Sequence, residues 1–271
     1  MLKQRILTAS LLALLAIAAL FVAPDWLWSG LILSVATIGA WEWAGFARIS
    51  NTWQRVLYAI LPAAVTVFAL QGLTLQVSLG LVVVEMLLLM LVVARYQKNS
   101  GKQGLDSPIF IMMAGILGLA LFAFAMIQFR AVAGPSALFL SLFTIWAMDT
   151  GAYFTGRRFG KHKLAVHVSP GKTWEGVWGG AVLAGLVALI GTFLISESAP
   201  IPLLPFVLLS AFIAMFSVFG DLFESVLKRQ VDLKDSGQLL PGHGGILDRI
   251  DSLLIAMPMF YLLWSIGALL R

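Results

Sequence analysis

The chain has 271 residues, of which 60% are hydrophobic and only 11% are charged. A soluble domain carries about 25% charged residues, so this composition excludes a soluble fold and indicates a polytopic membrane protein. The chain contains no cysteine, which excludes disulfides and thiolate metal sites. Its net charge of +5 follows membrane topology, and we expect no nucleic-acid partner.

Apolar runs of roughly 20 residues predict transmembrane helices, and hence an all-α fold with about nine spans. In chain order the spans are 6–23, 26–46, 56–74, 77–94, 109–129, 136–155, 176–196, 202–224 and 251–270. Lys3 and Arg5 before the first span are also typical of a signal peptide. The length of that run and the span that follows at once favour a retained helix. We expect one transmembrane domain, residues 1–271, in which residues 1–108 form a scaffold of N-terminal helices.

The distribution of basic residues predicts the orientation. With a cytoplasmic N-terminus, all lysines and arginines except Arg130 and Arg271 fall on the inner side. The positive-inside rule therefore favours this orientation, with the C-terminus outside. The polar loops 156–175 and 225–250 then face the cytoplasm, where nucleotides are available.

Apart from the acids that flank the last polar loop, three acidic residues fall inside predicted spans, where charge is costly and is often functional. Glu42 lies between Trp41 and Trp43, and both an interfacial anchor and a functional role stay open. Glu85 lies deeper, and we expect it to pair with a polar group of a neighbouring helix. Asp149 precedes the first polar loop, and its role, structural or functional, also stays open.

The segment SPGKTWEG, residues 169–176, combines hydroxyls with a cation just before a helix. Lys172 and Thr173 are placed as at the end of a P-loop, but the glycine spacing fails and no preceding strand is expected. A helix N-terminus favours anions, so Ser169, Lys172 and Thr173 could bind phosphate. The alternative is a plain capping segment, with Thr173 or Ser169 as N-cap and Glu175 in the first turn.

Two pairs of acids flank the last polar loop. Asp221 and Glu224 share one helix face at the inner end of span eight, where the helix dipole disfavours acids. Asp248 and Asp251 have the same spacing at the start of span nine, where capping is the alternative. Two such pairs on neighbouring helices predict an oxygen site for a hard divalent cation such as Mg²⁺.

The same loop carries cations and a bendable backbone. The basic residues that would hold phosphates are Lys228, Arg229, Lys234 and Arg249. Residues 241–245 read PGHGG, a backbone that can approach a ligand closely. His243 within it could act as an acid, a phosphate donor or a hinge contact.

These residues resemble a known signature. The elements are Ser225-x-x-Lys228-Arg229, Lys234-Asp235, PGHGG and Asp248-Arg249-x-Asp251, and together they closely resemble the pattern of the phosphatidate cytidylyltransferase (CDP-diacylglycerol synthase) family. Residues 149–161 and 169–176 are also similar to that family. Gly171 departs from the lysine or asparagine expected before Lys172.

The resemblance implies transfer of CMP from CTP to phosphatidic acid, which gives CDP-diacylglycerol and pyrophosphate. It implies that residues 109–271 carry the catalytic loops, in a bacterial-type cytoplasmic membrane with the active site on the cytoplasmic side. It further implies Mg²⁺, with a second metal ion as an option, contact with membrane lipid, and a homodimer.

The resemblance also implies roles for individual residues. The expected metal ligands are Asp221, Asp248 and Asp251. The expected catalytic residues are these three with Lys228 and Arg249. The expected substrate-binding residues are Ser169, Pro170, Lys172, Thr173, Lys228, Arg229, Lys234, His243 and Arg249.

Two other functions would leave different signals in the sequence. An ion-coupled transporter would place Glu85, Asp149 and Asp221 along an ion path, but the acids cluster at the inner face and no interrupted half-helices stand out. Another CTP- or CDP-lipid-dependent transferase, such as a CDP-alcohol phosphotransferase, would carry D-G-x-x-A-R and G-x-x-x-D-x-x-x-D, which the sequence lacks. Dependence of turnover on CTP and phosphatidic acid separates these functions.

Overall fold

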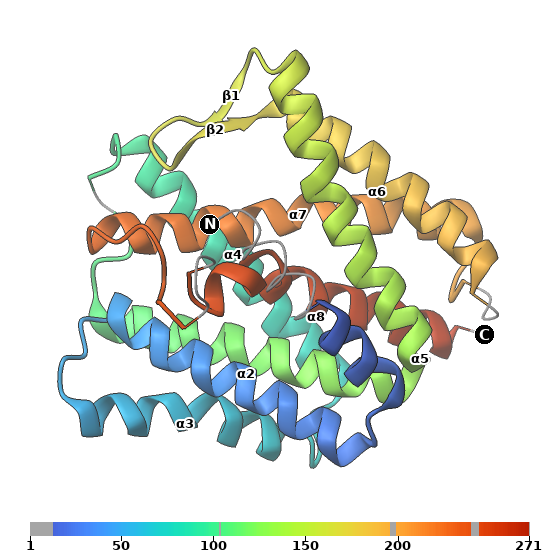
Figure 1. The fold of residues 1–271 in the computed structure, drawn as a ribbon, viewed down its shortest axis with the longest axis horizontal. Coiled ribbons are helices and arrows are strands. Elements are labelled where there is room, and N and C mark those ends of the chain that lie inside the picture. The colour runs from blue at the N-terminus through green and yellow to red at the C-terminus, as the bar shows by residue number, and fades with distance from the viewer. Residues whose placement is uncertain (1–12, 103, 196–198, 240–243, 271) are drawn as a thin grey trace.

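Helices make up most of the molecule (Figure 1). The structure is a computed structural model that describes residues 13–102, 104–195, 199–239 and 244–270. A short helix, Ala13–Val22, is followed by α2 (Asp25–Phe46), α3 (Thr52–Ala69), α4 (Leu75–Lys98), α5 (Pro108–Phe159), α6 (Trp174–Leu194), α7 (Leu203–Gln230) and α8 (Leu247–Leu269). The predicted helical, membrane-protein class is confirmed, because α4, α5, α6, α7 and α8 are long and apolar enough to cross a membrane.

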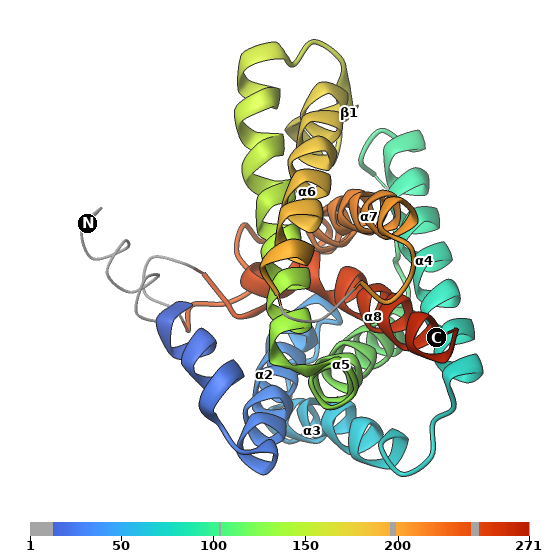
Figure 2. The same ribbon diagram turned by 90° about the vertical axis from the view of Figure 1, so that its right-hand side faces the viewer.

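A sharp break divides α5 into the two spans predicted at 109–129 and 136–155. Gly134 has φ 81° and ψ 167°, a conformation that glycine adopts without a steric penalty. Pro135 follows, and its ring cannot continue the helical hydrogen bonding. The two halves therefore run in different directions, and the second half stands beside α6 (Figures 1 and 2).

A small β-hairpin connects α5 to α6, where the sequence predicted a loop without strands. Strand β1 (Lys163–Ala165) pairs antiparallel with β2 (Ser169–Thr173). The prediction was wrong because strands this short carry no readable alternation of polar and apolar residues. Beyond the ladder, the Trp174 amide donates to the His162 carbonyl at 3.0 Å, which ties the hairpin to the start of α6.

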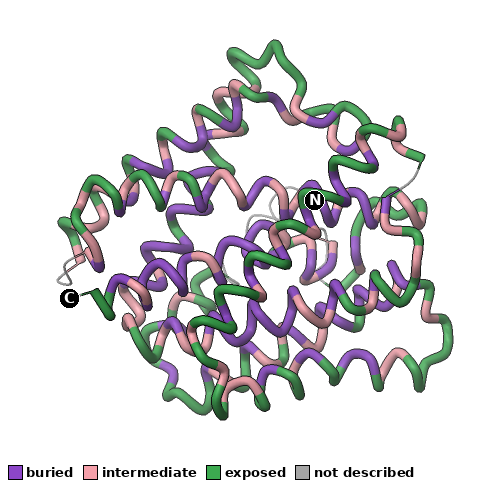
Figure 3. Tube along the Cα trace, turned by 180° about the vertical axis from the view of Figure 1, so that it is seen from behind, coloured by how far each residue is buried: buried purple, intermediate pink, exposed green. Residues whose placement is uncertain are grey.

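Helix α8 forms the centre of the core, and Figure 3 shows it largely buried. Its aromatic residues contact both neighbours: Trp264 packs against Phe129 of α5 and Phe206 of α7. The outer faces of α3, α4 and α6 instead expose large apolar side chains such as Leu57, Leu91 and Phe193. An apolar exterior around a packed centre is the arrangement expected of helices in lipid.

Close helix packing fixes the position of the hairpin. A Cβ atom on Gly151 of α5 would lie 3.0 Å from the Cα atom of Gly180 of α6. A Cβ atom on Gly180 would lie 2.5 Å from the Met148 carbonyl oxygen. Glycines at such contacts let two backbones approach closely in a membrane. The second half of α5 and α6 therefore form one rigid arm with the hairpin at its tip.

Candidate active site

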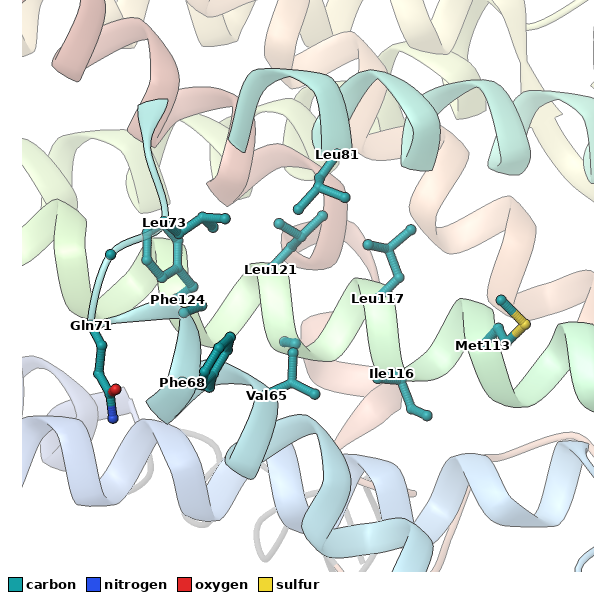
Figure 4. A pocket seen from close by; sticks show the side chains of 13 residues that line it. Val65, Phe68, Gln71, Leu73, Leu81, Met113, Ile116, Leu117, Leu121 and Phe124 are labelled. Carbon is teal, nitrogen blue, oxygen red and sulfur yellow. The ribbon is translucent and has the colours of Figure 1, made fainter. Parts of the chain in front are cut away.

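An apolar cavity of about 650 Å³ lies between α3, α4 and the first half of α5 (Figure 4). Among the described residues that line it, only Gln71 has a polar side chain. Leu81, Leu121 and Phe124 are typical of the remaining wall. A polyanionic nucleotide would leave its charge uncompensated there, so we place the active site elsewhere.

A second cavity, of about 470 Å³, is polar and lies between the second half of α5, strand β2, the start of α6 and α7. It gathers residues that are far apart in the sequence. Its polar side chains come from α5 (Asp149, Tyr153 and Arg157), from β2 (Ser169, Lys172 and Thr173) and from α7 (Asp221). Four of the predicted site residues, Ser169, Lys172, Thr173 and Asp221, therefore share one cavity.

An ion pair crosses this cavity. Lys172 Nζ lies 2.6 Å from Asp221 Oδ2, and both side chains remain partly exposed. The other carboxylate oxygen of Asp221 accepts a hydrogen bond from Ser225 Oγ at 3.3 Å. Asp149 is close enough to interact electrostatically with both members of the pair. The Lys172 ammonium thus lies among carboxylates, in a place that suits a cation.

The hairpin aims Lys172 into the cavity because the next residue is a helix cap. Thr173 is buried, and its Oγ1 accepts a hydrogen bond from the Gly176 amide at 3.2 Å. Thr173 is therefore the N-cap of α6, one of the two alternatives left open by the sequence. Glu175 accepts hydrogen bonds from the Lys161 and His162 amides, which holds the end of α5 against α6. The positive end of α6 faces the region in which Lys172 lies, which favours anions there.

Helices α7 and α8 cross closely beside the cavity. A Cβ atom on Gly220 would lie 2.3 Å from the Asp251 carbonyl oxygen, so only glycine permits this crossing. The crossing brings Asp251 close enough to Asp221 for electrostatic interaction. Acids from two neighbouring helices therefore lie near each other, and their role as metal ligands stays a prediction. Carboxylates at this point suit a hard divalent cation.

A second polar cluster lies one turn further along α7. Lys228 Nζ lies 2.7 Å from Asp248 Oδ1 and 3.2 Å from Glu224 Oε1. Asp248 Oδ2 accepts hydrogen bonds at 2.9 Å from the Ser236 amide, the Ser236 hydroxyl and the Gly245 amide. Both oxygens of Asp248 are thus engaged by the protein. Its role as a metal ligand stays a prediction, and would require Lys228 to release Oδ1.

The acids beside the cavity offer few ligands for a metal ion. Within the described part of the chain, no three Asp, Glu or His side chains form a ready-made metal-binding group. Mg²⁺ needs only one or two carboxylates, because water and substrate phosphates complete its shell. Asp221 and Asp251, with the Lys172 ammonium already acting as a counter-ion, fit such a site.

The other predicted residues that the structure describes are not part of the lining of the polar cavity. Arg229 lines a separate cavity of about 340 Å³ together with Arg48, Lys102 and Asp106. Pro170, Lys234 and Arg249 are exposed. His243 lies outside the described residues.

Two cavity residues, Tyr153 and Arg157, were missing from the predicted set. Their side chains are joined, since Arg157 Nη1 donates to Tyr153 Oη at 3.1 Å. Together with Asp149 they are spaced four residues apart, which places all three on one helix face. That spacing was the signal in the sequence that pointed to them.

Comparison with known proteins identifies the family. The profile of the cytidylyltransferase family matches residues 3–266.

The chain belongs to the cytidylyltransferase family.

Relatives of this cytidylyltransferase extend over nearly its whole length. A protein of Pseudomonas aeruginosa is 40% identical over 276 residues, which cover 98% of each chain. A protein of Haemophilus influenzae is 36% identical over 281 residues, covering 96% of this chain and 97% of the relative. A protein of Bacillus subtilis is 38% identical over 208 residues, covering 76% and 74%. All are named phosphatidate cytidylyltransferase, so the family resemblance seen in the sequence is confirmed.

Proposed function

We propose that this cytidylyltransferase transfers CMP from CTP to phosphatidic acid, giving CDP-diacylglycerol and pyrophosphate. The names of relatives that match nearly the whole chain support this reaction. The observation that carries it is the Lys172–Asp221 pair, a cation and an acid set across a polar cavity between apolar helices. One substrate is a lipid and the other is a nucleotide, so a polar cavity of this kind must lie at the membrane interface.

The residues in the cavity and beside it fall into two groups, one that would bind phosphate and one that would bind a cation. Ser169, Lys172 and Thr173, beside the N-terminus of α6, would bind the phosphates of CTP. Asp221 and Asp251 would hold Mg²⁺, which supplies neutralisation of phosphate charge when bound. A phosphate oxygen of phosphatidic acid forms a bond to the α-phosphorus of CTP, the bond from that phosphorus to the bridging oxygen breaks, and pyrophosphate leaves. Such chemistry depends on positioning and charge neutralisation.

We propose the topology that the sequence predicts: nine spans, a cytoplasmic N-terminus and an outer C-terminus in a bacterial cytoplasmic membrane. Basic residues near the ends of α2, α4, α5 and α7 support it, because Arg48, Lys98, Arg157 and Lys228 would all lie on the cytoplasmic side. The polar cavity would then open towards the cytoplasm. The homodimer stays a prediction.

The test is substrate dependence. Membranes containing the protein should convert labelled CTP into a lipid-soluble product only when phosphatidic acid and Mg²⁺ are both present. Asp221→Asn should abolish this turnover while the protein still inserts and folds, because the side chain is partly exposed. Product formation without phosphatidic acid, or normal turnover by Asp221→Asn at matched expression, would contradict the proposal.

A further inference from the structure

A buried carboxylate from the N-terminal helices reaches the loop that precedes α8. Glu42 lies near the end of α2 and is only 4% exposed. None of the ion pairs among the described residues includes it. A buried carboxylate without a cationic partner must be stabilised by hydrogen-bond donors.

The donors come from a segment some 200 residues away in the sequence. Glu42 Oε1 accepts from the Ile246 amide at 3.0 Å, and Oε2 accepts from the Leu247 amide at 2.9 Å. Oε2 also lies 3.1 Å from the Ser236 hydroxyl. Ile246 precedes α8, and its own side chain supplies no cap. Glu42 therefore caps α8 from another helix, where its charge also complements the helix dipole.

The surrounding backbone is shaped to admit this carboxylate. A Cβ atom on Gly245 would lie 2.4 Å from Glu42 Oε2, and one on Gly237 would lie 2.5 Å from Oε1. A side chain at either position would displace the Glu42 carboxylate from its present place. Gly237 and Gly245 thus lie close against the carboxylate, which argues against an interfacial anchor as the main role of Glu42.

The same contacts lead directly to the active site. The Ser236 hydroxyl lies between Glu42 Oε2 and Asp248 Oδ2, at 3.1 and 2.9 Å. Asp248 is in the first turn of α8 and pairs with Lys228, and Asp251 follows one turn later. A displacement of the start of α8 would therefore move both aspartates relative to α7.

We infer that Glu42 is a positioning residue for nucleotidyl transfer: its carboxylate, held on the scaffold helix α2, fixes the start of α8 and so the placement of Asp248 and Asp251 against α7. The inference rests on the proposed function for its catalytic consequence. Whether Glu42 caps α8 can be measured without an activity assay. Glu42 also fills the anion-binding end of α8, which leaves the N-terminus of α6 for substrate phosphate.

The decisive variant is Glu42→Gln, which keeps the shape but loses the charge and one acceptor. The matched control is Glu85→Gln, because Glu85 is an equally buried acid on another scaffold helix, α4. Ser236→Ala is a milder second variant that removes only the bridging hydroxyl. Each is compared with the wild-type protein in detergent by amide hydrogen exchange of the peptide 244–250, and by turnover per folded protein over a range of Mg²⁺ concentrations.

In Glu42→Gln, we expect exchange of this peptide to accelerate at least about 10-fold, since a hydrogen bond to a charged acceptor is lost. Turnover should fall about 10- to 100-fold, as for groups that orient metal ligands, with a higher Mg²⁺ requirement. Glu85→Gln should change neither. If Glu42→Gln does not fold, Ser236→Ala should show the same changes at smaller size.

Unchanged exchange, or unchanged turnover and Mg²⁺ requirement, in a folded Glu42→Gln protein would overturn the inference. Equal effects from Glu85→Gln would also overturn it, because the loss would then reflect general destabilisation. A wild-type protein that makes no lipid product would instead overturn the proposed function. The exchange comparison would still decide whether Glu42 caps α8.

Discussion

Replacing Lys172 by alanine separates binding from stability at the candidate active site. The Lys172–Asp221 ion pair has side-chain exposures of 25% and 34%. Solvent screening therefore limits its contribution to folding to about 0–1 kcal/mol. A charge-assisted hydrogen bond to a substrate phosphate contributes about 1.5–3 kcal/mol. Its loss should lower kcat/KM for CTP about 10- to 150-fold. We expect a large kinetic effect and a small change in thermal stability.

The assay varies CTP and phosphatidic acid separately in mixed micelles and records thermal unfolding of the same samples. Lys172→Ala should raise KM for CTP much more than KM for phosphatidic acid. Lys163→Ala is the matched control, because Lys163 is exposed and pairs with Thr173 across the same hairpin. Equal losses for both substrates, or a similar loss in Lys163→Ala, would refute the role in binding nucleotide phosphate.

Two further predictions concern contacts between helices, and a third concerns the metal. Asp248→Asn should lower stability by about 1.5–3 kcal/mol, because it removes the charged partner closest to Lys228 while Glu224 stays beside that lysine. Thermal unfolding in detergent would show this, and an unchanged unfolding temperature would contradict it. Gly220→Ala should force α7 away from Asp251, which should lower stability by about 1–3 kcal/mol and abolish most of the turnover. Gly80→Ala is the control, because Gly80 has open space around it, and it should change neither stability nor turnover. Chelation of Mg²⁺ should stop turnover reversibly, and activity that survives EDTA would argue against a metal at this site.

The helices, and the grouping of acids from neighbouring helices, could be predicted because each depends on a local pattern. Apolar runs must form helices in lipid, since every backbone group has to be satisfied within its own segment. The break between two predicted spans appeared at Gly134 and Pro135, both of which carry a local signal. The acids Asp221 and Asp251 could be paired because one lies near the end of a predicted helix and the other at the start of the next.

The rest depended on contacts that leave no periodic signal. The amides that hold Glu42 come from residues some 200 positions away, so the sequence could not decide between an anchor and a functional role. Lys228 and Arg229 are neighbours in the sequence, yet one pairs with Asp248 and the other lines a separate cavity. The rotation of α7 about its own axis decides which neighbours each of the two side chains contacts, and the sequence pattern does not specify that rotation.

The break within α5 bears on how the protein is assembled in the cell. Gly134 joins the two halves of α5 without an intervening polar stretch, and its φ of 81° would be strained for any other residue. We expect the insertion machinery to deliver them together as a helical hairpin, with no protease-accessible link between them on the far side.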